Sequence, residues 1–181
     1  MKNYIQIGKQ ITYLLRHNPE DLVMDKNGYV SVTSLLDKVG ITQSELDHIV
    51  DTNDKKRLAY NEDKSKIRAS QGHSIKVDVQ LKATRPPRVL YHGTTSESYQ
   101  LIMKSGLNKM KRLHVHLTDD YKIAYSVGKR YSKYKEPTIL EIDSAKMNTD
   151  GFKFFKSEND VWLTDNVPAK YISIKNENSN K

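Results

Sequence analysis

The sequence contains no cysteine, and this absence removes several kinds of chemistry at once. It excludes disulfide bonds, zinc sites built from thiolates and a cysteine nucleophile, and it allows folding in a reducing compartment. Apolar runs are short, because none approaches the roughly 18 to 20 residues that a membrane-spanning helix requires. The first residues also lack the apolar core of a signal peptide. We therefore expect a cytoplasmic protein that does not associate with membranes.

Several common site motifs are missing as well. The sequence has no GxGxxG, no GxxxxGK[ST] and no GxSxG, which argues against a Rossmann site, a P-loop and a nucleophile elbow. His114 and His116 would point to the same side of a strand, as a pair of metal ligands does. No third histidine or carboxylate stands at a recognisable spacing from them, so we expect no metal site.

What the chain does have is an excess of positive charge. Its 181 residues include 30 lysines and arginines against 22 acidic residues, a net charge of +8. Hydrophobic residues make up 36% and charged residues 29%, as in a folded protein with a polar surface. The charge favours an anionic partner such as a nucleic acid, although in many lysine-rich proteins it is merely solvated.

The first part of the chain has the pattern of a small helical module with a hairpin. Apolar residues recur at helical spacing over residues 5–15, and Pro19 follows the end of that helix. Further on, we predict a short strand over 29–32, a helix capped by Thr33 or Ser34 and ended by Gly40, a helix from Thr42, and a β-hairpin over 57–60 and 66–69. This order is typical of a winged-helix module.

A boundary signal, Thr-Arg-Pro-Pro at residues 84–87, separates this module from the rest. We therefore predict two lobes, residues 1–83 and 84–181, with 75–79 as either a strand or an extended linker. In the second lobe we predict helices over 97–104 and 121–131 and strands over 89–95, 114–118, 138–142, 152–155, 161–164 and 171–174. The expected class is α+β, with a mainly β second lobe that contains two helices.

Two strand-like runs of the second lobe each carry a histidine in their second half. They are residues 89–95 (VLYHGTT) and 114–118 (HVHLT); Gly93-Thr94 follows His92 directly, and Thr118 follows His116 after Leu117. Exposed backbone, a hydroxyl and an imidazole suit a polar ligand such as a sugar. For one such run alone, a hairpin with core histidines is the simpler interpretation, but two runs favour binding.

Arginines provide a second candidate site. Arg16, next to His17, and Arg68 lie in the first lobe, and Arg112 and Arg130 lie in the second. A guanidinium binds phosphate bidentately and stays charged at working pH. Several arginines that converge with one histidine would suit a doubly charged terminal phosphate. Each arginine alone could instead be a surface residue or form a salt bridge.

Six short motifs, in order, carry a resemblance to a known family. They are residues 14–19 (LLRHNP), 25–30 (DKNGYV), 67–74 (IRASQGHS), 90–94 (LYHGT), 114–118 (HVHLT) and 161–164 (VWLT). They resemble successive signatures of the tRNA 2′-phosphotransferase family, over about residues 4 to 174. The resemblance implies an N-terminal winged-helix lobe that binds RNA and a C-terminal ADP-ribosyltransferase-like lobe that binds NAD.

The resemblance also implies a reaction. Enzymes of this family remove an internal RNA 2′-phosphate, as at a tRNA splice junction, and pass it to NAD as co-substrate. The phosphate displaces nicotinamide from C1″ of the ribose, giving an ADP-ribosylated RNA phosphate. The ribose 2″-hydroxyl then attacks the phosphorus, which yields RNA with a 2′-hydroxyl and ADP-ribose 1″,2″-cyclic phosphate. The implied protein acts on tRNA-like RNA and NAD, and we expect a monomer.

Matched position by position, Arg16, His17, Arg68 and Arg130 correspond to the family's catalytic group. Arg16 and Arg68 would bind the RNA 2′-phosphate, and His17 would hold that phosphate or donate a proton to the leaving oxygen. Arg130 would bind the migrating phosphate from the NAD side. Arg130-Tyr131-Ser132 replaces the family's usual Arg-His-Gly, so Arg112 is the alternative to Arg130.

The resemblance assigns the histidine runs to NAD. His92 and His116 would touch ribose hydroxyls, and the neighbouring residues Gly93, Thr94, Thr95, Leu117 and Thr118 would line the same cleft. Two other functions stay open. The first is an NAD-dependent ADP-ribosyltransferase that leaves ADP-ribose on nucleic-acid phosphate ends. The second is a non-enzymatic winged-helix nucleic-acid binder, whose binding would not depend on NAD.

Overall fold

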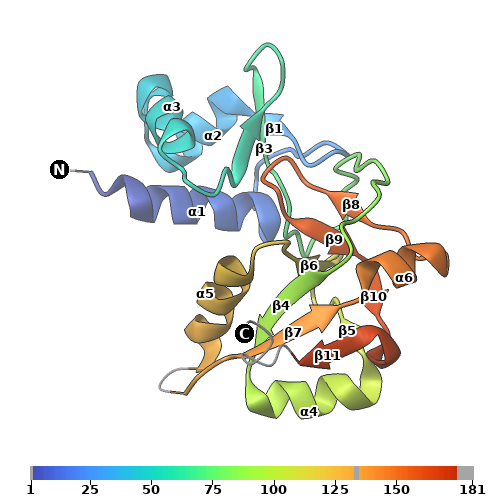
Figure 1. Ribbon diagram of the computed structural model, residues 1–181. Helices are drawn as coiled ribbons and strands as arrows, with labels where there is room; N and C mark the ends of the chain where they lie inside the picture. Colours follow the sequence, from blue (N-terminus) through green and yellow to red (C-terminus); the bar gives the residue numbers. More distant parts are fainter. Residues whose placement is uncertain (1, 133–134, 175–181) are drawn as a thin grey trace. The chain divides into compact units, whose positions relative to one another are not determined.

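The computed structural model describes residues 2–132 and 135–174. Within these residues the chain forms six α-helices and eleven short strands, the strands pairing into four antiparallel sheets (Figure 1). The predicted mixed α and β class is confirmed at this level. No helix in the described ranges has both the length and the apolar character needed to cross a membrane.

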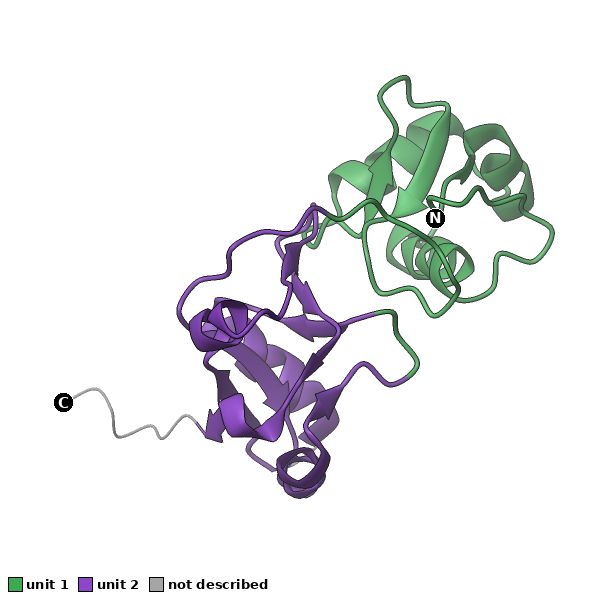
Figure 2. Cartoon of the chain, turned by 90° about the vertical axis from the view of Figure 1, so that its right-hand side faces the viewer, with its two compact units in different colours: residues 1–81, 111–113 green, residues 82–110, 114–181 purple. Residues whose placement is uncertain are grey.

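The chain divides into two compact units (Figure 2). Unit 1 comprises residues 1–81 and 111–113, and unit 2 comprises residues 82–110 and 114–181. Each unit has its own cluster of buried hydrophobic side chains, so each is described by itself.

Unit 1 contains three helices and one three-stranded sheet. Its elements are α1 (Tyr4–Arg16), β1 (Val30–Ser31), α2 (Val32–Val39), α3 (Gln43–Asp51), β2 (Leu58–Tyr60) and β3 (Lys66–Ala69). The sheet has the order β1-β3-β2, with β3 antiparallel to both neighbours. The predicted order of helix, strand, helix, helix and hairpin is therefore confirmed.

Capping explains where these helices begin and end. Thr42 and Glu45 form a capping box at the start of α3, and Gly40 ends α2 with a φ of +70°. The prediction that Thr33 or Ser34 caps α2 was wrong, because the hydroxyl of Ser31 accepts from the amide of Ser34. β1 passes directly into α2, which leaves no loop for a later cap. Residues 75–79 form no strand.

The core of unit 1 fixes the end of α1 against the sheet. Ile11 and Leu15 of α1, Leu46 of α3 and Ile67 of β3 are all fully buried in one cluster. Burying each such side chain contributes about 1.5–3 kcal/mol. Because Ile67 precedes Arg68 and Leu15 precedes Arg16, the packing of these apolar residues also places the two arginines.

Unit 2 combines three helices with three small sheets. Its elements are β4 (Leu90–Thr94), α4 (Ser96–Ser105), β5 (Leu107–Asn108), β6 (Val115–Leu117), α5 (Tyr121–Ser132), β7 (Thr138–Ile142), α6 (Ser144–Thr149), β8 (Phe155–Lys156), β9 (Trp162–Thr164), β10 (Asn166–Val167), a 3₁₀ turn (Ala169–Tyr171) and β11 (Ile172–Ile174). The sheets have the orders β11-β7-β4, β6-β9-β8 and β10-β5. The prediction of two helices omitted α6, which Asp143 caps.

The two histidine runs lie side by side. They form β4 and β6, and an isolated antiparallel bridge joins Tyr91 to Thr118. The amide of Tyr91 donates to the carbonyl of Thr118 at 2.7 Å, and the amide of Thr118 donates back at 3.1 Å. This pairing brings together residues that are more than twenty positions apart in the sequence.

Candidate functional site

The segment that follows β3 folds back onto the end of α1. The amide of Ser74 donates to the carbonyl of Arg16 at 2.9 Å, and the Ser74 hydroxyl lies 2.9 Å from Nδ1 of His17. Gly72 contributes by having no side chain and a φ of +87°, because a Cβ atom there would lie 3.4 Å from Cζ of Arg16. The guanidinium of Arg16 therefore lies directly against the backbone at Gly72.

The guanidinium of Arg68 contacts a turn that contains Asn27 and Tyr29. Only 7% of Arg68 is exposed, and its Nη1 donates to the carbonyl of Asn27 at 3.4 Å. Its guanidinium carbon lies 4.5 Å from the centroid of the Tyr29 ring, in the range of a cation–π contact. One carboxylate oxygen of Asp25 accepts from the amides of Asn27 and Tyr29, each at 3.0 Å, which stabilises the turn.

The charge around Arg16 is unusual for a largely buried cation. Burial, followed by the positive charges of Arg57 and Arg112, lowers the pKa of Arg16 to about 10. Its Nε and Nη2 are buried and have no hydrogen-bond partner among the described residues. A buried cation surrounded by cations is unfavourable unless an anion joins it. This arrangement is that of an anion site.

His73 lies in the same cluster as Arg16, His17 and Arg68, and the sequence analysis did not identify it as a site residue. It is 1% exposed, and its Nε2 has no hydrogen-bond partner among the described residues. Burial first, then the charges of Arg16, Arg68 and His17, lower its pKa to about 4, so the ring is neutral at pH 7. The charges of all three residues lower the pKa of the same imidazole. The structure therefore places Arg16, His17 and Arg68, all predicted site residues, around His73. Its place in the motif IRASQGHS was the only sequence signal.

His17 lies on the solvent side of the cluster. The residue as a whole is exposed, but its ring is partly buried. This partial burial, followed by the positive charges of Arg16 and Arg112, lowers the pKa of His17 below the usual value of a histidine. A bound phosphate dianion would raise this pKa again, because an opposite charge favours the imidazolium. Arg112, the predicted alternative to Arg130, belongs to unit 1.

In unit 2, a hydrogen bond fixes the ring of His92. Its Nδ1 lies 3.0 Å from the backbone carbonyl of His116. A carbonyl oxygen only accepts, so Nδ1 carries the proton and the neutral ring has an unprotonated Nε2. Such a nitrogen accepts a hydrogen bond from a hydroxyl. The ring of His92 thus contacts the backbone carbonyl of His116 where β4 and β6 lie side by side.

Helix α5 packs directly on the backbone of β4. A Cβ atom on Gly93 would overlap the carbonyl oxygen of Ala124 and would lie 2.7 Å from the amide nitrogen of Gly128. Glycine at position 93 therefore permits a contact that any side chain would block. Arg130 is exposed on the last turn of the same helix. It lies in unit 2, whereas Arg16, His17 and Arg68 lie in unit 1.

The remaining predicted NAD residues lie in β4 and β6 or directly after them. Thr94 is buried, Leu117 packs in the core of unit 2, and Thr118 pairs with Tyr91. The Thr95 hydroxyl accepts from the amide of Ser98 at 3.2 Å and so caps α4.

A pocket of about 290 Å³ adjoins Thr95, and its lining residues are Thr95, Ser96, Glu97, Tyr131, Ser132, Lys135 and Glu136. In the described part of the chain, no group of three or more acidic or histidine side chains could hold a metal ion.

Comparison with known proteins identifies the family. Residues 2–166 match the family model described as RNA 2′-phosphotransferase, Tpt1 / KptA family. The chain belongs to this family. A probable RNA 2′-phosphotransferase of Flavobacterium johnsoniae is 49% identical over 93% of this chain and 95% of its own length. Similarly named proteins of Fusobacterium nucleatum and Trichormus variabilis are 47% and 42% identical, over 96% and 95% of this chain and 100% and 97% of their own lengths.

The RNA 2′-phosphotransferase family match confirms the resemblance drawn from the six motifs, all of which lie within the matched residues. The match covers parts of both units. Arg16 and Arg68 of unit 1 and the paired histidine strands of unit 2 therefore all lie within the residues that the family model matches. The roles assigned above to individual residues stay predictions.

Proposed function

We propose that the protein removes an internal 2′-phosphate from RNA and transfers it to NAD, releasing nicotinamide and ADP-ribose 1″,2″-cyclic phosphate. The observation that carries this proposal is Arg16, a largely buried cation that feels the positive charges of Arg57 and Arg112 and whose buried Nε and Nη2 have no hydrogen-bond partner among the described residues. Membership of the RNA 2′-phosphotransferase family supports the same substrate. In this proposal unit 1 is a winged-helix RNA-binding lobe and unit 2 is an ADP-ribosyltransferase-like lobe.

The β4–β6 junction fits a ribose. The unprotonated Nε2 of His92 accepts from a ribose hydroxyl, and Gly93, Thr94, Thr95, His116, Leu117 and Thr118 complete the binding region of the proposal. Bound there, NAD supplies an electrophilic C1″ carbon, with nicotinamide as the leaving group. The orientation of His92, fixed by the His116 carbonyl, is the part of this fit that the structure supports directly.

In the first step the chain has to position and shield charge. The RNA 2′-phosphate is already an anion, so its attack requires no strong base. Arg16 and Arg68 hold this phosphate, and the support of Arg68 by Tyr29 and by the Asn27 carbonyl restricts its geometry. Such positioning converts binding energy into rate when the reacting groups are held in line.

In the second step the ribose 2″-hydroxyl loses its proton to solvent and attacks the phosphorus, while the bond from phosphorus to the RNA 2′-oxygen breaks. His17 donates a proton to the leaving 2′-oxygen, and Arg130 binds the phosphoryl oxygens from the NAD side. The lowered pKa of free His17 rises when the phosphate binds, so the imidazolium forms where its proton is used. Ser74 keeps the ring in place through its contact with Nδ1.

A product assay tests the proposal. The protein is incubated with NAD and a short RNA that carries one internal 2′-phosphate, and the RNA and nucleotide products are resolved. Loss of the phosphate together with formation of ADP-ribose 1″,2″-cyclic phosphate is the expected result. RNA that keeps its phosphate and gains ADP-ribose would instead indicate an ADP-ribosyltransferase. Binding of RNA with no reaction would indicate a nucleic-acid binder.

A further inference from the structure

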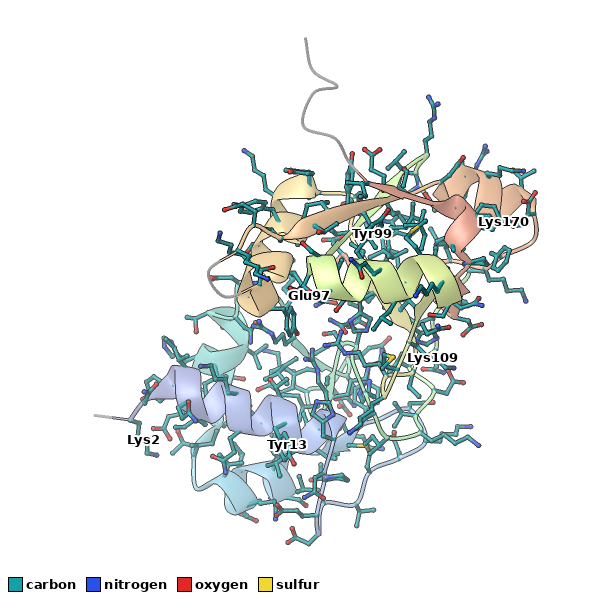
Figure 3. The ribbon with its side chains drawn as sticks, turned by 90° about the horizontal axis from the view of Figure 1, so that it is seen from below. Lys2, Tyr13, Glu97, Tyr99, Lys109 and Lys170 are labelled. Atoms are coloured by element: carbon teal, nitrogen blue, oxygen red, sulfur yellow. The ribbon has the colours of Figure 1, made fainter. Side chains whose placement is uncertain are left out.

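Tyr13 is an exposed aromatic residue beside the arginine cluster of unit 1. Its side chain belongs to α1, and 55% of the residue is exposed (Figure 3). The buried side of this helix is formed by Gly8, Ile11, Leu14 and Leu15, so Tyr13 takes no part in the core. Among the described residues of unit 1, it is the only tyrosine, phenylalanine or tryptophan that is exposed.

The position of Tyr13 relative to His17 distinguishes it from a scattered surface residue. The two side chains are one helical turn apart, and their ring centroids are 5.5 Å apart at an interplanar angle of 51°. The Tyr13 hydroxyl has no hydrogen-bond partner among the described residues. The contact between Tyr13 and His17 is therefore a packing contact between the two rings. A flat apolar surface thus lies directly beside the proposed phosphate ligand.

We propose that the ring of Tyr13 stacks on the base of the nucleotide that carries the 2′-phosphate. This inference rests on the proposed function, because it takes the phosphate to bind at Arg16, His17 and Arg68. In that nucleotide the base is attached to C1′ of the ribose, next to the carbon whose oxygen bears the phosphate. A phosphate in contact with His17 therefore brings its own base within reach of the neighbouring ring.

Stacking on one tyrosine also defines the substrate class. Every nucleobase has a π-face, so an aromatic platform of this kind accepts all four bases. Recognition would then come from the 2′-phosphate, read by the arginines, and the presence of a base, read by Tyr13. The site would take a 2′-phosphorylated nucleotide of any sequence, and it would bind a 2′-phosphorylated ribose without a base more weakly.

Binding measurements in the absence of NAD test this inference. The full chain is titrated into labelled RNA hexamers with one internal 2′-phosphate, whose phosphorylated nucleotide carries either adenine or no base. Wild type is expected to bind the adenine probe about 5- to 150-fold more tightly, which corresponds to the usual contribution of one stacked base. Tyr13→Phe should keep this ratio. Tyr13→Leu should reduce it to about one and leave binding of the probe without a base unchanged.

Three results would overturn the inference. Tyr13→Leu could keep the preference for the base, Tyr13→Phe could lose it as fully as Tyr13→Leu, or Tyr13→Leu could weaken binding of both probes equally. Ile5→Ala is the matched control, because Ile5 is an exposed apolar residue of the same helix, at 75% exposure. A probe with a 2′-hydroxyl separates the two proposals: if wild type does not prefer the phosphate, the proposed function fails, whatever Tyr13 does.

Discussion

The guanidinium carbon of Arg68 lies 4.5 Å from the centroid of the Tyr29 ring, and Nη1 of the same guanidinium donates to the carbonyl of Asn27. Both supporting residues come from one turn between α1 and β1, which Asp25 stabilises. Arg68 itself comes from β3, a distant part of the sequence. The phosphate site of the proposal is therefore built by three separate segments of unit 1: the end of α1, this turn, and the segment from β3 to Ser74.

Replacing Tyr29 should weaken the proposed phosphate site without removing any charge. Loss of a largely desolvated cation–π contact corresponds to about 1–2 kcal/mol. We therefore expect Tyr29→Leu to lower kcat/KM for 2′-phosphorylated RNA about 5- to 30-fold, whereas Tyr29→Phe keeps the ring and the activity. Steady-state kinetics measure both. Equal activity of Tyr29→Leu and wild type would show that the ring does not position Arg68.

Removing Arg68 should abolish phosphate transfer and leave the fold intact. Arg68→Ala deletes a buried guanidinium that the proposal places on the reacting phosphate, where charge-assisted hydrogen bonds are strongest. A loss of at least about 100-fold in kcat is expected, as for other preorganised electrostatic contacts. The matched control is Arg85→Ala, which removes an exposed arginine of unit 2. Turnover of Arg68→Ala at the rate of the control would refute the phosphate clamp.

Local patterns account for what could be predicted of the fold. Helix α1, the β2–β3 hairpin and the histidine strands depend on spacing and turn residues, which the sequence displays directly. Helix α6 spans only Ser144–Thr149, too short for a helical period to appear, and β5 and β10 exist because they pair with each other across the chain. Such pairings arise from tertiary contacts.

The same distinction applies to the site. Arg16, His17 and Arg68 carry recognisable chemistry, and the motifs name them. His73 lies in one of the motifs but was not recognised as a site residue, because its importance comes from burial and from the charges of three side chains that act on it only in the folded chain. Arg112 is similar: it lies far along the sequence but belongs to unit 1, where its charge acts on Arg16 and His17.

His73 should make unit 1 sensitive to mild acid. Its pKa is about 4 in the folded protein, against 6.5 for an unperturbed histidine. Between these values the unfolded chain binds the proton and the folded chain does not, so stability falls as the pH falls from 6.5 to 4. The total loss is about 3 kcal/mol, at about 1.4 kcal/mol for each pH unit. Urea unfolding of wild type and His73→Gln over this range measures it, and parallel pH profiles would contradict the prediction.

Gly93 should be the most sensitive glycine of unit 2. An alanine there would drive its Cβ into the Ala124 carbonyl and towards the Gly128 amide, both of which belong to the backbone of α5. Because backbone cannot rotate away as a side chain does, α5 would have to move off β4, and Arg130 would move with it. We expect Gly93→Ala to lower the free energy of unfolding by about 3 kcal/mol or more, the upper range for overpacked cores.

Gly40→Ala provides the comparison for this variant. Gly40 has a φ of +70°, but no atom lies within 4 Å of the position of its Cβ, so the substitution tests backbone conformation alone. That strain corresponds to about 1–2 kcal/mol. Thermal and urea unfolding of both variants measure the difference. If Gly93→Ala were no more destabilising than Gly40→Ala, α5 would not be packed on the backbone of β4, and the placement of Arg130 by this contact would be wrong.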